Sequence, residues 1–352
     1  MTEGEKKMAK KVVCIYDRGI DKAAMSGFCQ LEEYGYEVEL IEKTVGETPL
    51  EYQNSMLEVE VNGPDKTPIN PEAYQAVADA EIIITHFAPV GKKLMDAAPN
   101  LKIIGTLRTG VENINLEEAE KRNIKVINAP GRAAAAVADF TVAAMVCEMR
   151  NIARTDADIK KGLWTKKFEN MAYSDNMCNM KVGLIGFGDI GKRIAKRLQA
   201  FGTTIMVYDP YCKKEDIEAL GCAAGSMEEV VSECDFVSLH MRLTPETKGM
   251  FGKHWIEKMK PTAIFVNTAR AGLVDEQALI DALRNKRIGG AVLDVFQEEP
   301  LSEDHVLRKL DNVTLSAHLA GTSIGTFTAS VDIVADSLRD YLSGKPLRNI
   351  VA

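Results

Sequence analysis

Residues 181–198 read KVGLIGFGDIGKRIAKRL, and this stretch decides the fold. An apolar strand pattern runs directly into Gly186, Gly188 and Gly191, which are spaced G-x-G-x-x-G, and an amphipathic helical pattern follows. The first glycine permits a tight turn, the second lets the backbone approach a pyrophosphate, and the third lets the helix pack close to the strand. The stretch therefore predicts a Rossmann dinucleotide-binding domain.

The next strand pattern ends on Asp209, 18 residues after Gly191. A carboxylate at this position accepts both ribose hydroxyls of NAD but repels the 2′-phosphate of NADP, although a strand-end aspartate can also simply form a turn. Neither Pro210 nor Tyr211 offers a cation to a 2′-phosphate. The sequence thus predicts NAD as the cofactor, bound by Gly186, Gly188, Asp189, Ile190, Gly191 and Asp209.

Strand patterns alternate with helical patterns in two series along the chain. Alternation of this kind predicts doubly wound parallel sheets, and 352 residues are enough for two domains. The fold class is therefore α/β, with two parallel-sheet domains. The expected strands are residues 11–17, 36–42, 80–86, 101–107 and 124–130 in the first series, and 181–187, 203–209, 235–241, 262–267, 289–296 and 312–318 in the second.

Two helical patterns are expected to connect the domains. Residues 132–161 predict one long helix that leaves the first domain, and residues 326–344 predict a helix that returns to it. The expected boundaries are residues 1–131 plus 325–352 for one domain and 132–324 for the other. Two chain crossings form a hinge, so we expect ligand to bind in a cleft between the domains.

Composition excludes several classes of protein. A net charge of −8 argues against sequence-independent nucleic-acid binding. The apolar run 133–149 contains two acidic residues and is shorter than a bilayer requires, so it predicts a buried helix and no membrane span. The N-terminus lacks an export signal, and seven scattered cysteines fit free thiols, so we expect a cytoplasmic protein. Five histidines without local pairing predict no metal site.

Three polar side chains follow strands of the second series. Arg270 follows residues 262–267, Glu299 follows the next strand, and His318 ends the last one. Each alone has an ordinary structural explanation as a helix cap, a solvated turn residue or a structural histidine. Together they supply the cation, the acid and the proton donor that hydride transfer to a 2-oxo acid requires. Arg270 stands among small residues without an obvious ion-pair partner, which leaves room for a substrate anion.

The order of these motifs resembles the D-isomer-specific 2-hydroxyacid dehydrogenases, a broad group that includes D-3-phosphoglycerate dehydrogenase. The resemblance covers nearly the whole chain, and a run of ordered motifs is more specific than any single one. The matching stretches are LRTGVENINL, PGRAAAAVADFTVAAM, GLW, GLIGFGDIG, LTPETKGMF, VNTARAGLVDEQAL, GGAVLDVFQEEPL and NVTLSAHLAG.

The resemblance implies a role for each candidate residue. Arg270 binds the carboxylate and keto oxygen of the substrate, His318 is the acid/base, and Glu299 hydrogen-bonds His318 and raises its affinity for a proton. It also implies a flavodoxin-like substrate domain, a Rossmann NAD-binding domain and a homodimer. The implied substrate-binding residues are Arg108, Thr109, Gly110, Arg270 and His318; the implied cofactor-lining residues include Met241, Arg242, Thr247, Thr268, Ala269, Arg270, Asp294, His318 and Gly321.

The leading interpretation is an NAD-dependent oxidoreductase that interconverts a D-2-hydroxy acid and its 2-oxo acid. The alternative is an NAD(H)-sensing binding protein similar to the C-terminal-binding-protein corepressors, which keep the same three residues. A formate dehydrogenase is disfavoured because that group has Gln at the position of Glu299, while a phosphite-oxidising enzyme stays open. His86, Arg108 and Arg132 either read an anionic or hydroxylated tail, which favours 3-phosphoglycerate or a sugar-derived acid, or are ordinary surface residues.

Overall fold

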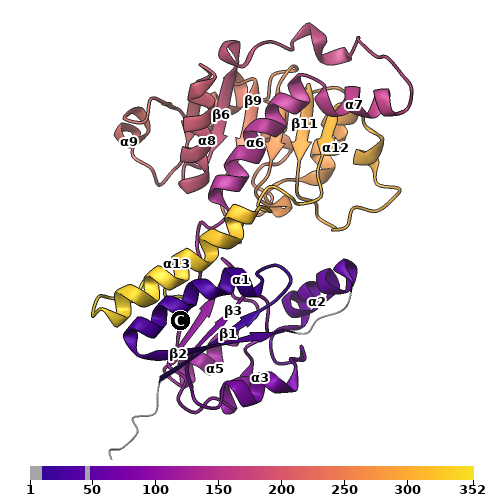
Figure 1. The fold of residues 1–352 in the computed structure, drawn as a ribbon. Coiled ribbons are helices and arrows are strands. Elements are labelled where there is room, and N and C mark those ends of the chain that lie inside the picture. Colours follow the sequence, from indigo (N-terminus) through magenta and orange to yellow (C-terminus); the bar gives the residue numbers. More distant parts are fainter. Residues whose placement is uncertain (1–9, 44–47) are drawn as a thin grey trace, which may run out of the picture. The chain divides into compact units, whose positions relative to one another are not determined.

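The computed structural model describes residues 10–43 and 48–352. Most of the N-terminal segment on which the expectation about export rests, residues 1–9, lies outside the described part. The chain divides into unit 1, Met1–Arg132 with Ser323–Ala352, and unit 2, Ala133–Thr322. The expected boundaries differ from these by one residue and by two. Each unit contains one parallel sheet, of five strands and of seven, which confirms the predicted α/β fold class (Figure 1).

Unit 1 is a doubly wound parallel sheet. Its elements are β1 (Lys10–Tyr16), α1 (Lys22–Met25), η1 (Ser26–Tyr34), β2 (Tyr36–Glu42), α2 (Pro49–Asn62), α3 (Pro71–Ala76), β3 (Ala80–Thr85), α4 (Lys92–Asp96), β4 (Ile103–Thr106), α5 (Leu116–Lys121), β5 (Lys125–Ile127) and α13 (Ile324–Leu342). The strand order is β2-β1-β3-β4-β5, so the winding reverses between β1 and β3. This is the flavodoxin-like order that the resemblance implied.

Both faces of this sheet are covered. Side chains alternate between the faces of a strand, and in β1 Val12 and Cys14 belong to one buried cluster while Val13 and Ile15 belong to the other. Because neither face of the sheet meets water, β1 is apolar at consecutive positions instead of at every second one. The first cluster includes side chains of α13, which lies beside α1 in Figure 1. The C-terminal segment therefore completes the core of unit 1.

Unit 2 is the second doubly wound sheet. Its elements are α6 (Ala134–Met149), α7 (Ile152–Lys160), η2 (Glu169–Ala172), η3 (Met177–Asn179), β6 (Lys181–Ile185), α8 (Asp189–Ala200), β7 (Thr204–Tyr208), α9 (Lys214–Glu218), β8 (Ala223–Ala224), α10 (Met227–Glu233), β9 (Phe236–Leu239), α11 (Lys253–Ile256), β10 (Ile264–Asn267), η4 (Ala271–Leu273), α12 (Glu276–Arg284), β11 (Gly290–Leu293), η5 (Val306–Lys309) and β12 (Val313–Leu315). The order β12-β11-β10-β9-β6-β7-β8 places the reversal at β6, where a Rossmann sheet binds its ligand.

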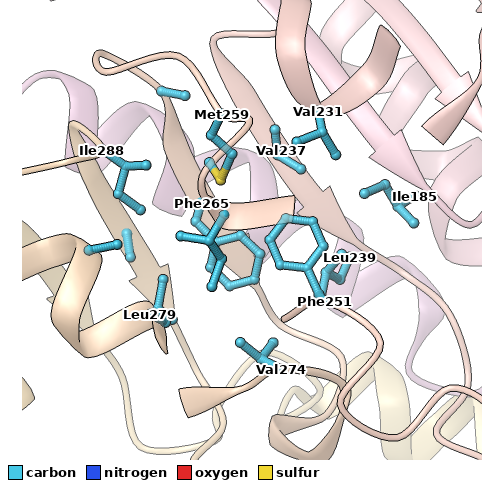
Figure 2. Packing of buried hydrophobic residues seen from close by; sticks show 14 of the residues in the cluster. Ile185, Val231, Val237, Leu239, Phe251, Met259, Phe265, Val274, Leu279 and Ile288 are labelled. Atoms are coloured by element: carbon cyan, nitrogen blue, oxygen red, sulfur yellow. The ribbon is translucent and has the colours of Figure 1, made fainter. Parts of the chain in front are cut away.

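The core of unit 2 positions the strand ends that carry the candidate site. On one face of the sheet, α10 and α12 contribute Val231 and Leu279 to a buried cluster with the strands (Figure 2). The rings of Phe251 and Phe265 stack at its centre, 4.9 Å apart and inclined by 23°. Close packing of this kind leaves the strands little freedom to shift.

One expected helix is divided. The predicted helix over residues 132–161 is wrong as a single element, because α6 ends at Met149 and Asn151 adopts a left-handed φ of 55° before α7 begins. A buried polar network explains the break. Glu148 accepts two hydrogen bonds from Arg154, at 2.7 and 2.9 Å, and the Asn151 amide donates to Asn170 at 2.7 Å. Residues 22–34 of unit 1 also form two elements, the short α-helix α1 and the 3-10 helix η1.

The apolar run 133–149 forms α6 and is largely buried, as expected. None of the described helices combines the length and hydropathy that are needed to cross a membrane.

Candidate active site

The glycine loop after β6 has the geometry that its spacing predicts. Gly186 adopts φ 100°, and a Cβ there would lie 2.7 Å from the backbone of His240. A Cβ at Gly191 would lie 2.5 Å from the Gly186 carbonyl oxygen, so this glycine lets α8 approach the loop. A Cβ at Gly188 would meet nothing within 4 Å, so the loop is open there, at the N-terminus of α8. The open side and the helix amides fit a pyrophosphate.

Asp209 directly follows β7, and its side chain links the end of this strand to the glycine loop. Its carboxylate accepts hydrogen bonds from the backbone N–H groups of Phe187 at 2.6 Å, Tyr211 at 2.8 Å and Cys212 at 3.1 Å. The turn-forming role considered for Asp209 is thus present. A carboxylate has about four lone-pair positions, so capacity remains for a ribose hydroxyl.

Arg270 follows β10 in a turn that the buried Asn267 holds. The Asn267 side chain donates to the Arg270 carbonyl and accepts from the Ala269 N–H, both at 3.0 Å. The exposed guanidinium of Arg270 donates to the Ala269 carbonyl at 2.7 Å, and within the described residues no carboxylate lies within ion-pair distance of it. The cation is therefore available to an external anion. The neighbouring Thr268 hydroxyl is hydrogen-bonded to Thr141 of α6 at 2.8 Å.

Glu299 and His318 form a pair. His318 Nδ1 lies 2.8 Å from Glu299 Oε2, and Glu299 Oε1 accepts from the Phe296 N–H at 3.0 Å. About half of the His318 side chain is exposed, at 48%, so its other nitrogen can reach a ligand. The backbone of His318 adopts a left-handed φ of 53°, which few non-glycine residues do and which is common at functional sites.

Asp294 directly follows β11 and is fully buried. Its carboxylate accepts from the Ser316 hydroxyl at 2.6 Å and from the N–H groups of Leu319 and Ala320 at 2.8 and 2.9 Å. These bonds fix both sides of the turn that carries His318. The resemblance implied only that Asp294 lines the cofactor; the structure adds this anchoring contact.

The remaining expected cofactor residues lie in loops of unit 2. Met241, Arg242 and Thr247 follow β9, where the Thr247 hydroxyl donates to the Arg242 carbonyl at 2.7 Å. Gly321 lies close to Ala133 at the start of α6, since a Cβ at Gly321 would be 3.4 Å from the Ala133 Cβ.

Sequence reasoning missed one neighbour of the glycine loop. His240 Nε2 lies 2.7 Å from the Ser238 hydroxyl, and burial lowers the pKa of the imidazole to about 3, so the ring is neutral. Its backbone lies against Gly186. The signal was its position near the end of the strand pattern 235–241, directly after the last residue of β9.

The expected substrate residues of unit 1 follow β4. Thr109 is held by its own hydroxyl, which donates to the Ala129 carbonyl at 3.2 Å, and by the Asn128 amide, which donates to the Thr109 carbonyl at 2.6 Å. Among the described residues, the backbone N–H groups of Thr109 and Gly110 have no acceptor, so they can bind an anion. Arg108 is paired with Glu60 through one nitrogen and is buried, contrary to the surface alternative.

In the described part of the chain, no group of three or more His, Cys, Asp or Glu side chains could hold a metal ion.

Comparisons with known proteins agree with this geometry. A model of the D-isomer specific 2-hydroxyacid dehydrogenase NAD binding domain matches residues 142–320. A D-3-phosphoglycerate dehydrogenase of Methanocaldococcus jannaschii is 37% identical over 283 residues, which are 80% of this chain and 53% of that protein. A glyoxylate reductase of Korarchaeum cryptofilum is 35% identical over 279 residues, which are 79% of this chain and 84% of that protein.

A solved structure shows the same fold. The NAD-complexed D-isomer specific 2-hydroxyacid dehydrogenase of Lactobacillus delbrueckii ssp. bulgaricus has a TM-score of 0.76 and 24% identity, over 97% of this chain and 100% of that chain. The chain spans about half the length of the phosphoglycerate dehydrogenases that it matches. The family match confirms the predicted NAD-binding domain and NAD as the cofactor. The chain belongs to the D-isomer specific 2-hydroxyacid dehydrogenase family.

Proposed function

We propose that the chain is an NAD-dependent oxidoreductase that interconverts a D-2-hydroxy acid and its 2-oxo acid. The observation that carries this proposal is the combination, within one unit, of a histidine paired with a carboxylate and an arginine without an ion-pair partner among the described residues. A 2-oxo acid needs a cation for its carboxylate and a proton donor for its oxygen, and these side chains supply both.

Each residue has a distinct task in this mechanism. Arg270 binds the substrate carboxylate and polarises the keto oxygen. His318 gives a proton to that oxygen during reduction and takes it back during oxidation, through the ring nitrogen that Glu299 leaves free. Glu299 stabilises the protonated imidazole, and Asp294 holds the turn in place. When bound, NADH supplies the hydride that reduces C2.

The backbone N–H groups of Thr109 and Gly110 are proposed to bind the substrate carboxylate as well. They have no acceptor among the described residues, and Asn128 fixes the orientation of their loop. Glyoxylate, 3-phosphohydroxypyruvate and oxo acids derived from sugars are candidate substrates, since relatives of this chain are named as glyoxylate reductases and D-3-phosphoglycerate dehydrogenases.

The corepressor-like alternative gains no support from these relatives, which are named as dehydrogenases and reductases.

We also propose that the protein is a homodimer. Exposed apolar side chains in and after α7 support a second copy at this surface of unit 2, with Trp164 76% exposed and Leu163 54% exposed. Size-exclusion chromatography with light scattering tests the assembly.

The experiment that tests the activity follows NADH oxidation with a panel of 2-oxo acids: glyoxylate, pyruvate, hydroxypyruvate, oxaloacetate and 3-phosphohydroxypyruvate. We expect turnover of at least one of them, and its loss in His318→Ala by at least about a hundredfold. Tight NADH binding without reduction of any acid would instead favour the NAD-sensing alternative.

A further inference from the structure

A second cluster of polar and charged side chains lies entirely in unit 1, at the carboxyl ends of its strands. Asp17 follows β1, His86 follows β3, Arg108 follows β4 shortly after its end, and Arg132 comes after β5. The strand order reverses between β1 and β3, and open α/β sheets bind ligands at the carboxyl edge beside such a reversal. The cluster therefore occupies the position where this fold is expected to bind a ligand.

Asp17 fixes the orientation of His86. One Asp17 oxygen lies 3.0 Å from His86 Nδ1 and also accepts from the Tyr52 hydroxyl at 2.9 Å and the Gly19 N–H at 2.9 Å. Burial alone would raise the pKa of Asp17, but these hydrogen bonds and the nearby imidazole lower it to about 2. The carboxylate is ionised, so the proton of the neutral imidazole lies on Nδ1.

The other nitrogen of His86 has no partner. The His86 side chain is 2% exposed, and its buried Nε2 has no hydrogen-bond partner among the described residues. Burial lowers the pKa of His86 although Asp17 opposes the effect, so the ring is neutral and Nε2 is an acceptor. A buried acceptor without a donor costs free energy unless a ligand supplies one. A ligand hydroxyl group would be such a donor.

Two arginines add positive charge beside this nitrogen. Arg108 lies over the Phe87 ring at 3.9 Å, pairs with Glu60 through Nη2, and leaves a buried Nη1 without a partner among the described residues. Arg132 is partly buried; it donates to the Ser330 hydroxyl at 3.2 Å and has no carboxylate within ion-pair distance in the described chain.

The environment of Arg132 is unfavourable to its charge. Burial and the charge of Arg108 lower the pKa of Arg132 to about 10, which still leaves it charged at neutral pH. Lys43 adds a third cation nearby, with its ammonium donating to the Phe87 carbonyl at 3.3 Å. Of the carboxylates around the cluster, Asp17 is buried and already saturated, the exposed Glu60 and Glu112 both lie beside Nη2 of Arg108, and Glu58 acts on Lys43. Nη1 of Arg108 nevertheless has no hydrogen-bond partner and Arg132 has no carboxylate within ion-pair distance among the described residues, so an oxyanion would complete both.

We propose that His86, Arg108 and Arg132 form a subsite for the tail of the substrate, and that this substrate is a 2-oxo acid whose tail carries a hydroxyl group and a second oxyanion. This inference deepens the proposed function and rests on it. The arginines bind the oxyanion, which is a carboxylate or a phosphate, and His86 Nε2 accepts a hydrogen bond from the hydroxyl.

The first test compares kcat/KM for acids that differ only in their tails: pyruvate, hydroxypyruvate, oxaloacetate and 3-phosphohydroxypyruvate. Charge-assisted hydrogen bonds discriminate by about 10- to 100-fold, so the wild-type ratio of an anionic-tailed acid to pyruvate should be at least about tenfold. Arg132→Gln should lower this ratio by a similar factor. The preferred acid, oxaloacetate or 3-phosphohydroxypyruvate, identifies the oxyanion as carboxylate or phosphate.

Arg122→Gln is the matched control. It also removes one guanidinium from unit 1, but Arg122 is paired with Asp96 and Glu118 at the end of α5. We expect the ratio to stay unchanged in this variant. An unchanged ratio in Arg132→Gln, or an equal fall in both variants, overturns the subsite. If Arg132→Gln does not fold, Arg132→Lys is compared with Arg122→Lys instead. We then expect a smaller fall in the kcat/KM ratio for Arg132→Lys and no fall for Arg122→Lys.

His86 is tested by a substitution that keeps a donor for Asp17. His86→Asn should lower the kcat/KM ratio of hydroxypyruvate to pyruvate by about tenfold, because the shorter amide can donate to Asp17 but places no acceptor at the position of the imidazole Nε2. An unchanged ratio removes His86 from the subsite.

The second test needs no turnover and separates the subsite from the reaction. Inorganic phosphate, which carries both a hydroxyl and oxyanion oxygens at neutral pH, is titrated into the full chain while thermal unfolding is followed. We expect phosphate to stabilise the wild type and Arg122→Gln but not Arg132→Gln. If phosphate stabilises only the wild type and Arg122→Gln while no 2-oxo acid is reduced, the anion subsite stands and the proposed reaction fails. If acids are reduced but phosphate stabilises all three proteins equally or none, the reaction stands and the subsite is overturned.

Discussion

His318 Nδ1 lies 2.8 Å from one carboxylate oxygen of Glu299, while the other oxygen of Glu299 accepts from the Phe296 N–H at 3.0 Å. The carboxylate is thus held from both sides and in turn fixes the imidazole. Nε2 of His318 makes no hydrogen bond within the described residues, and in the proposed reaction this nitrogen contacts the substrate oxygen. An orienting carboxylate of this kind stabilises the imidazolium that forms when the substrate alcohol loses its proton.

Glu299→Gln should therefore reduce turnover more than cofactor binding. The amide keeps the size of the side chain but loses the charge that stabilises the protonated imidazole, so kcat should fall by about 10- to 100-fold. Steady-state NADH oxidation gives kcat, and fluorescence titration gives the Kd for NADH, which should change little. Glu298→Gln, at the exposed neighbouring position, is the control. Unchanged turnover in Glu299→Gln would contradict the pairing.

Arg270→Lys should weaken substrate binding while it retains the positive charge. Lysine cannot reproduce the planar fork with which a guanidinium binds a carboxylate, so kcat/KM for the best 2-oxo acid should fall by about 10- to 100-fold. Arg284→Lys, at the exposed end of α12, should have no effect. Equal kinetics in Arg270→Lys and the wild type would show that this cation does not hold the substrate.

The wild-type protein should prefer NADH to NADPH by at least about tenfold in kcat/KM, because the Asp209 carboxylate repels a 2′-phosphate. Initial rates with the two cofactors at a saturating 2-oxo acid measure the preference. Comparable efficiency with both would leave Asp209 with only its structural role, the three hydrogen bonds to Phe187, Tyr211 and Cys212.

Two glycines of the same loop should respond differently to alanine. Gly191→Ala should destabilise unit 2 by about 1–3 kcal/mol, because the new Cβ would lie 2.5 Å from a carbonyl oxygen. Gly188→Ala meets no protein atom within 4 Å, so folding should be nearly unaffected while NADH binding weakens. Chemical denaturation and NADH titration separate the two effects. The reverse pattern would refute the roles assigned to the glycines.

Unit 1 should lose stability as the pH falls below about 6.5. Burial lowers the pKa of His86 below its unfolded value of 6.5, so the unfolded chain binds more protons. The contribution of His86 is therefore fully present above pH 6.5 and is lost as the pH falls towards the folded pKa. Asp17 acts in a lower window, below its unfolded value of 3.8 and down to about 2.

Thermal unfolding between pH 7.5 and pH 5 measures this effect. The melting temperature of His86→Gln should depend less on pH than that of the wild type, whereas His254→Gln, at an exposed position on α11, should match the wild type. Parallel curves for the wild type and His86→Gln would contradict the assignment of a neutral, buried imidazole.

The sequence predicted the parts of the fold that depend on short-range patterns. Strand periodicity located β1–β5 and most of unit 2, and the glycine spacing predicted the loop before α8, because these features follow from local sterics and from burial on both faces of a sheet. The break between α6 and α7 was missed. It depends on Asn151 and Glu148 reaching Asn170 and Arg154, contacts that no local pattern encodes.

The candidate site was predicted to a similar extent. Strand ends pointed to Arg270, Glu299 and His318, since parallel strands present their carboxyl ends at one edge. The anchoring contacts of Asp294 and the burial of His86 and Arg108 could not be read from sequence, because a buried histidine and an exposed one look the same in a string of residues. Such contacts depend on how loops far apart in the chain pack together.

Unit 1 is built from two separate segments of the chain, and this affects the order in which the units can fold during synthesis. Its core requires Val331, Val334 and Leu338 of α13, and the Val126 N–H of β5 donates to the Ala352 carbonyl at 2.8 Å. Unit 2 is one continuous stretch, Ala133–Thr322, and is fully translated before any residue of α13. Domains generally fold as units while the ribosome elongates the chain. The cofactor-binding unit can therefore fold from one continuous segment, whereas the sheet of unit 1, whose strands are translated before unit 2, must wait for α13 to complete its core.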